Sequence, residues 1–168
     1  MALSALLAQL SVVLHDAGGA RYGAPVNGGS SIGAHVRHVL DHVSCVAERG
    51  RSGLIDYDDR QRGTAIETDL PAAIERIREL RAALDQIGEE SLEVPIRIRS
   101  RVTTDGEPVV CGTTLRRELV FVVSHTVHHH ALIAMLCARL AAPVPADFGL
   151  APATLAHLKE QTCAPSAS

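Results

Sequence analysis

The sequence predicts an all-α fold in which helices pack side by side, with one small β-hairpin. Of the 168 residues, 46% are apolar and 21% are charged, which is enough to bury one sizeable core. We therefore expect a single domain over residues 1–163 and a disordered tail at 164–168. The chain has two Tyr, two Phe and no Trp, so Leu, Val, Ile and Ala must fill the core. Such a core suits packed helices.

Glycines and capping side chains mark the first two helices. Residues 2–17 are expected to form a helix that two consecutive glycines end. The loop at 27–31 then supplies side-chain oxygens that can cap a second helix over about 31–49. The polar, glycine-containing stretch at 51–68 predicts an irregular connection.

The next elements are a third helix and the hairpin. Asp69 is expected to cap the helix, which tolerates Pro71 in its first turn and carries an apolar stripe as far as Ile87. Between Leu92 and Val110 the apolar period changes to two, and Asp105-Gly106 provides a turn. This segment therefore predicts two antiparallel strands.

A long fourth helix follows the hairpin. Thr113 or Thr114 is expected to cap it, and it covers about 114–141, where two prolines end it. A short fifth helix is expected at 151–161. We find no internal repeat.

Charge and cysteine spacing exclude several classes of protein. The net charge of −3 gives no electrostatic reason to expect a nucleic-acid partner. The four cysteines form no CxxC pair, so we expect reduced thiols rather than a zinc ribbon or a redox motif. The apolar stretch at 2–14 has no Lys or Arg ahead of it, which favours a first helix over a signal peptide. No apolar run approaches the roughly 20 residues of a membrane span, so the expected compartment is the cytoplasm and no membrane partner is expected.

Seven of the nine histidines lie in two short segments. His125 and His129 are four residues apart, so on a helix both imidazoles can reach one divalent metal ion. His35, His38 and His42 form a second set that can supply a third ligand. A lone histidine is more often a surface or half-buried residue than a ligand, but two matching sets favour a metal site.

A helical wheel distinguishes the histidines of the fourth helix. His129 falls inside the apolar stripe and His125 at its margin, whereas His128 and His130 are expected to project away from it. Glu118 lies two turns before His125, where it could hydrogen-bond a ligand or a bound water.

On the second helix the wheel does not identify which histidine is the third ligand, although His35 and His42 lie nearer to the apolar stripe than His38. The zinc-protease motif HExxH and the Glu-x-x-His pairs of di-iron bundles are absent. What remains is a three-histidine site with open positions for water and substrate.

Two motifs give the chain a family resemblance. Ser31-Ile32-Gly33 is followed five residues after the glycine by His38, and an HxxxH pair starts at His125. The chain resembles the DinB/YfiT-like superfamily of metalloenzymes over roughly residues 5–160. In that family the second motif continues with Arg-Gly-Gln, whereas this chain has His130-Ala131-Leu132.

The resemblance implies an up-down four-helix bundle with the hairpin inserted before the fourth helix, often dimeric. It selects His38, His125 and His129 as the metal ligands, overriding the wheel for the second helix. It implies a divalent ion, Zn or Ni first and Fe or Mn as alternatives. The implied reaction is thiol transfer or hydrolysis on a small molecule, with a low-molecular-weight thiol as a possible substrate. A homodimer is also expected.

Secondary roles follow from this reading. Glu118 or Asp41 could position ligands or shuttle a proton, and the arginine face at 97–101 could attract an anionic substrate. Cys45 and Cys137 are expected to be buried, unreactive thiols. The alternative function is a non-catalytic bundle that binds a metal or another ligand.

Overall fold

The structure, a computed structural model, describes residues 1–50, 53–59 and 63–163; the tail expected at 164–168 lies outside this range. It is mostly helical with a small sheet. The helices are α1 (Ala2–Ala17), α2 (Gly19–Tyr22), α3 (Ile32–Glu48), α4 (Leu70–Asp85), α5 (Leu115–Arg139) and α6 (Pro152–Cys163), and the short 3-10 helices are η2 (Ala65–Glu67) and η3 (Glu89–Ser91). The strands are β1 (Leu54–Asp56), β2 (Pro95–Ser100) and β3 (Val109–Thr114).

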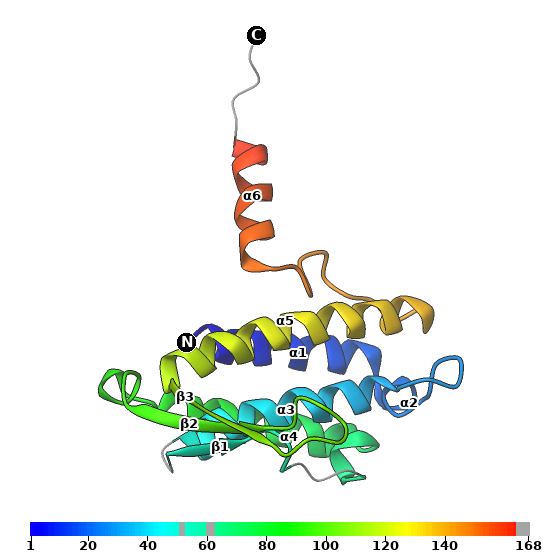
Figure 1. Cartoon of the computed structure of the whole chain (residues 1–168). Coiled ribbons are helices and arrows are strands. Elements are labelled where there is room, and N and C mark those ends of the chain that lie inside the picture. The colour runs from blue at the N-terminus through cyan, green and yellow to red at the C-terminus, as the bar shows by residue number, and fades with distance from the viewer. Residues whose placement is uncertain (51–52, 60–62, 164–168) are drawn as a thin grey trace.

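Four long helices pack around the core. α3 lies against α4 and α5, and α1 also lies against α4 and α5. Figure 1 shows α1 and α5 running side by side, with α3 and α4 beneath them. The core between them is aliphatic, as the composition predicts; its fully buried members include Leu7, Leu10, Leu14, Val36, Leu40, Leu80, Leu84 and Ile133. Burial of these side chains is the main force that holds the helices together.

Threonine and serine side chains fix the starts of the two longest helices. The Ser31 hydroxyl accepts a hydrogen bond from the Ala34 amide at 3.1 Å and begins α3. Of the two expected caps of α5, it is Thr114 that accepts from the Arg117 amide, at 3.3 Å. The observed helix ends lie within two residues of the predicted ends for α1, α3, α5 and α6.

The sheet joins the end of α3 to the start of α5. Its order is β1-β2-β3, with β1 parallel to β2 and β2 antiparallel to β3, so that Ile98 pairs with Ile55 on one side and Cys111 on the other. The hairpin is thus confirmed. The expectation of an irregular connection at 51–68 was wrong in part, because β1 and η2 lie within it. A three-residue strand gains its hydrogen bonds from β2 and has no periodic signal of its own.

α5 and α6 differ in how much of their surface is covered. By length and composition α5 could cross a membrane, contrary to the sequence expectation. The core helix of a soluble protein has the same properties, and α5 contacts both α1 and α3. α6 extends away from the other helices (Figure 1), and its side chains are largely exposed.

Candidate metal centre

Two facing helices bring five histidines together. His35, His38 and His42 lie on α3 at spacings of three and four residues, and His125 and His129 lie on α5 at a spacing of four. Such spacings place side chains on one face of a helix, and here the two faces meet because α3 packs against α5. The imidazole centroids are separated by 4.2 Å (His42 to His125), 4.5 Å (His38 to His42), 4.6 Å (His38 to His129 and His125 to His129), 5.0 Å (His38 to His125) and 5.3 Å (His35 to His129).

Two pairs of ring nitrogens are in direct contact across the helix interface. The Nε2 atoms of His38 and His125 are 3.0 Å apart, and the Nδ1 atoms of His35 and His129 are 3.1 Å apart. Two nitrogens bound to one ion at about 2.0–2.1 Å lie roughly 3 Å apart, so the separation between His38 and His125 also suits two donors that share a metal. The donor set is therefore chemically and geometrically suited to a divalent ion.

The three predicted ligands all belong to this cluster. His38 and His125 form its centre, and the His129 ring contacts both of them. The potential ligand atoms that lie within 4.8 Å of one another come from His38, His42 and His125. In this conformation Nδ1 of His129 is directed at His35 instead.

Burial keeps part of the cluster uncharged. The His129 side chain is only 8% exposed, and its pKa falls to about 3 because of burial first and the neighbouring His125 and His35 second. Burial and then His128 also lower the pKa of His35. A neutral imidazole retains the lone pair that a metal ion requires.

Two aromatic side chains border the cluster. The Tyr57 ring stacks on His42 with centroids 5.2 Å apart, and Phe121 stacks on His125 at 5.8 Å. Tyr57 and Phe121 also meet edge to face at 5.6 Å. Sequence reasoning missed both residues. Tyr57 lies in the stretch expected to be irregular, and only its rarity in a chain with two tyrosines distinguishes it.

Glu118 lies at the end of this aromatic border. It is buried, and its two carboxylate oxygens accept hydrogen bonds from the hydroxyls of Tyr57 and Thr113, each at 2.8 Å. Through Tyr57 the carboxylate is linked to the ring that stacks on His42. The hydrogen bonds that the structure assigns to Glu118 thus come from hydroxyls, not from a histidine.

The outward histidines of α5 behave differently from one another. His128 is exposed, as the wheel predicts. The prediction for His130 was wrong: its side chain is fully buried and stacks on Phe148 at 4.5 Å. The segment after α5 folds back over this residue, which a helical wheel cannot foresee. Among the described residues neither ring nitrogen of His130 has a hydrogen-bond partner, and burial lowers its pKa to about 4.

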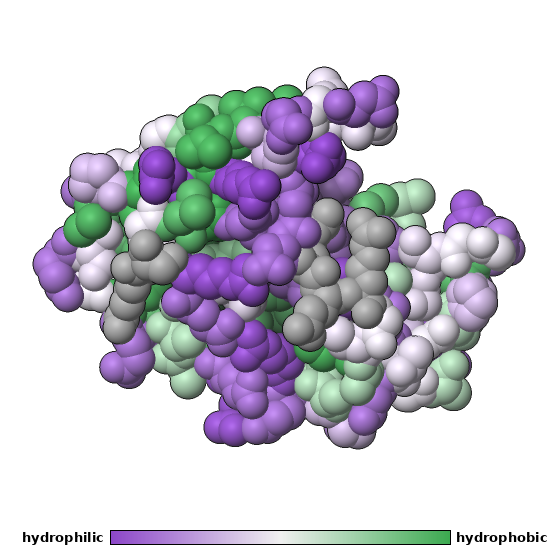
Figure 2. All heavy atoms as spheres, turned by 60° about the horizontal axis from the view of Figure 1, so that its bottom comes forward, coloured by the Kyte–Doolittle hydropathy of each residue, from purple (hydrophilic) through white to green (hydrophobic). Residues whose placement is uncertain are grey.

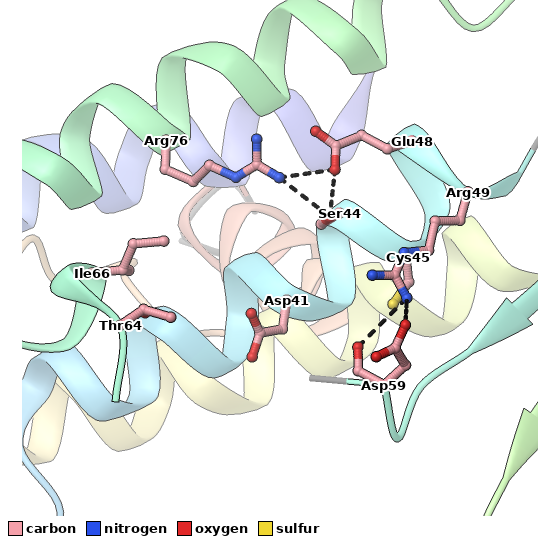
Figure 3. A pocket seen from close by; sticks show the side chains of 9 residues that line it. All are labelled: Asp41, Ser44, Cys45, Glu48, Arg49, Asp59, Thr64, Ile66 and Arg76. Carbon is pink, nitrogen blue, oxygen red and sulfur yellow. Dashed lines mark hydrogen bonds and ion pairs between the residues drawn. The ribbon is translucent and has the colours of Figure 1, made fainter. Parts of the chain in front are cut away.

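A polar hollow of about 370 Å³ lies along α3 near the cluster. Figure 3 shows its lining, in which Arg76 contacts Glu48 and Ser44, and Arg49 contacts Asp59. Asp41 also lines the hollow, and Arg37 binds its carboxylate at 2.7 Å. Opposite charges therefore neutralise one another across much of this wall.

The thiol of Cys45 also faces this hollow. Its pKa rises to about 11, chiefly because of burial, so the thiol is protonated at neutral pH. Cys137 is buried too, and burial raises its pKa. Both cysteines are thus buried, as expected, and a protonated thiol is a poor nucleophile.

The arginine face of the hairpin is partly engaged with acids. Arg99 pairs with Asp56 at 3.1 Å, and the Arg101 side chain donates to the Gly106 carbonyl at 2.7 Å. Figure 2 views the molecule from the side of α4 and the sheet, and hydrophilic residues cover much of the middle of that face.

A helical domain with facing histidines on two of its helices defines a class of proteins that is often metal-binding. The chain belongs to the DinB superfamily, whose model matches residues 2–133. It is similar in structure to a DinB-like protein, YjoA, from Bacillus subtilis, with a TM-score of 0.61 and 20% identity over 85% of this chain and 92% of the other. At this identity the likeness concerns the fold alone.

One curated relative is similar in sequence. It is the FK506-binding protein 5 of Rhizopus delemar, which is 34% identical over 109 residues. The match covers 64% of this chain but only 28% of the relative, so the chain spans less than a third of that protein's length.

Proposed function

We propose that this chain is a divalent-metal-dependent enzyme whose ion is held by His38, His125 and His129. The observation that supports this most directly is the 3.0 Å separation of the Nε2 atoms of His38 and His125, from two different helices. His129 touches both rings and is neutral at physiological pH. We further infer that α1, α3, α4 and α5 form the up-down bundle of the superfamily.

The ion proposed here is Zn²⁺ or Ni²⁺, with Fe²⁺ and Mn²⁺ as alternatives, because imidazole is a good donor to most of these metals. When bound, such an ion lowers the pKa of a coordinated water or thiol and so supplies a nucleophile at neutral pH. The proposed reaction is thiol transfer to, or hydrolysis of, a small molecule.

The residues around the cluster would orient the substrate. Phe121 is 39% exposed and stacks on His125, so an apolar part of a substrate can contact this ring beside the histidines. Tyr57 and Glu118 form a buried hydrogen-bonded pair next to His42, which supports a positioning role for Glu118.

A homodimer and a cytoplasmic location complete the proposal. Three apolar side chains on the outer surface of α1 and α5 are more than half exposed: Val12 (55%), Val120 (62%) and Met135 (59%). Single exposed apolar side chains are also common on monomers, so the proposed homodimer rests on the resemblance to the superfamily. Cys45, Cys111 and Cys137 are free thiols, which suits a reducing compartment.

The test is metal analysis of the protein purified without a histidine tag, beside His125→Ala. We expect a stoichiometric divalent ion in the wild type and a large loss in the variant. A full metal complement in His125→Ala would refute the ligand assignment. Turnover of an electrophile with several thiols then tests catalysis.

A non-catalytic metal- or ligand-binding role is the second candidate, and His130 supports it. This residue stands where the family motif has arginine, and it is buried against Phe148 rather than directed at the histidine cluster. If the protein binds a stoichiometric metal ion but neither consumes a thiol nor hydrolyses a substrate, the non-catalytic role is favoured over the enzymatic one.

A further inference from the structure

We propose that His42 is an additional ligand, so that the metal centre of this chain draws on four histidines: His38, His42, His125 and His129. This inference rests on the proposed function, because it adds a donor to the same site. It changes what the ion can do, since a fourth protein donor removes a position that water or substrate would otherwise use.

The position of His42 is the first argument. It lies one helical turn after His38 on α3, and its ring is 4.5 Å from that of His38 and 4.2 Å from that of His125. The ligand atoms of these three residues lie within 4.8 Å of one another. Donors bound to one ion at about 2.0–2.1 Å lie roughly 3 Å apart, so the binding of an ion would draw these three atoms closer together.

The second argument is the tautomer of His42. Its Nδ1 lies 3.0 Å from the backbone carbonyl oxygen of His38. A carbonyl oxygen only accepts hydrogen bonds, so Nδ1 of a neutral His42 must carry the proton. The lone pair is then on Nε2, which is the atom that binds a metal when Nδ1 is hydrogen-bonded in this way.

The third argument is the support behind the ring. His42 is 7% exposed, and Tyr57 stacks on it with an angle of 19° between the planes. Tyr57 is itself held by its hydrogen bond to Glu118, whose second oxygen accepts from Thr113. Residues from outside α3 therefore fix the orientation of the His42 ring, as a precise metal ligand requires.

Four histidines have a consequence for metal preference. Zinc is usually four-coordinate and tetrahedral, so four imidazoles would fill its coordination sphere, as in structural zinc sites. Ions that accept five or six ligands would keep an exchangeable position. We therefore expect the zinc form to be less reactive than the nickel, iron or manganese form.

The experiment uses Co²⁺ as a spectroscopic probe on the tag-free full chain. Wild type, His42→Gln, His38→Gln and the control His157→Gln, on α6, are titrated with Co²⁺, and affinity for Zn²⁺ is measured by competition. We expect His42→Gln to bind at least about tenfold more weakly and to change the visible cobalt spectrum. The control alters an exposed residue and should match the wild type in both measurements.

A second variant keeps the test decisive if His42→Gln folds poorly. In His42→Cys a ligating thiolate would add a cobalt–sulfur charge-transfer band in the near ultraviolet, which a non-ligating residue would not produce. Absence of this band in the folded variant would overturn the inference.

The two proposals fail in different ways. If His42→Gln keeps wild-type affinity and spectrum while His38→Gln loses the ion, His42 is not a ligand and the proposed metal site stands. If His38→Gln and His125→Ala both bind Co²⁺ like the wild type, the proposed function itself is wrong.

Discussion

Nδ1 of His35 lies 3.1 Å from Nδ1 of His129, so the two imidazoles share one hydrogen bond across the interface of α3 and α5. Such a bond fixes the ring orientation of a metal-binding histidine through its other nitrogen. In the proposed metal site, His35 would therefore position His129.

Removing this bond should weaken metal binding without unfolding the protein. For His35→Ala we expect affinity for Zn²⁺ or Ni²⁺ to fall on the order of tenfold, while His35→Gln, which can still form a hydrogen bond, recovers part of the loss. Competition with a chelating dye measures both affinities. Equal affinities for His35→Ala and the wild type would contradict the positioning role.

The hydrogen bond from Tyr57 to Glu118 should contribute more to stability than a neutral one. Tyr57→Phe removes a donor from a buried carboxylate, and we expect a loss of roughly 1.5–3 kcal/mol in the free energy of unfolding. Tyr22→Phe is the matched control, because its hydroxyl donates to the neutral carbonyl of Ile66 at 2.6 Å and its loss should cost about 1 kcal/mol. Urea unfolding measures the stability of both variants. Equal losses in the free energy of unfolding would argue against a charged Glu118 as the acceptor.

Gly33 fixes how closely the start of α3 approaches η2. A Cβ at this position would lie 2.0 Å from the Glu67 carbonyl oxygen, so Gly33→Ala must displace backbone. We expect a loss of more than about 2 kcal/mol in stability and weaker metal binding, because His35 and His38 follow directly. Gly19→Ala is the control, since nothing lies within 4 Å of its Cβ. Thermal unfolding measures both variants. Equal unfolding temperatures for Gly33→Ala and Gly19→Ala would contradict the importance of this backbone contact.

His130 should make the stability of the metal-free protein depend on pH. Its folded pKa of about 4 lies below the usual 6.5, so the unfolded chain binds a proton more readily. Its contribution is fully present above about pH 6.5, and stability falls as the pH drops from there to about 4, by about 3 kcal/mol in all.

Urea unfolding across this interval, wild type against His130→Leu, isolates the effect. As the pH falls, the free energy of unfolding of the wild type should decrease relative to that of His130→Leu. A constant difference between wild type and His130→Leu would show that His130 does not titrate as its burial implies.

Periodicity predicted α1, α3, α4 and α5 well because each of them buries one face, whereas the side chains of α6 are largely exposed. The apolar stripes of α1, α3 and α5 gave their ends within two residues, and Thr114 and Ser31 cap as expected. α2 and β1 were missed because they are four and three residues long, too short for a periodic pattern.

The candidate site was predictable in part. Spacing identified the five histidines, and packing of α3 on α5 brings them together. The contact of Tyr57 with His42 and the burial of His130 under Phe148 depend on segments that fold back from outside the helices, so no local pattern encodes them. The helical wheel placed His35 and His42 nearer to the apolar stripe than His38, and only the family resemblance favoured His38 as the ligand.

The hairpin between β2 and β3 turns at residues 101–108, and β2 lies next to the strand that leads into Tyr57. The amide of Tyr57 donates to the Arg99 carbonyl at 3.2 Å. Insertions or deletions at the tip of this hairpin would leave the register of the histidine-bearing helices intact. Evolution can therefore diversify what approaches the aromatic border while the facing histidines of α3 and α5 stay where they are.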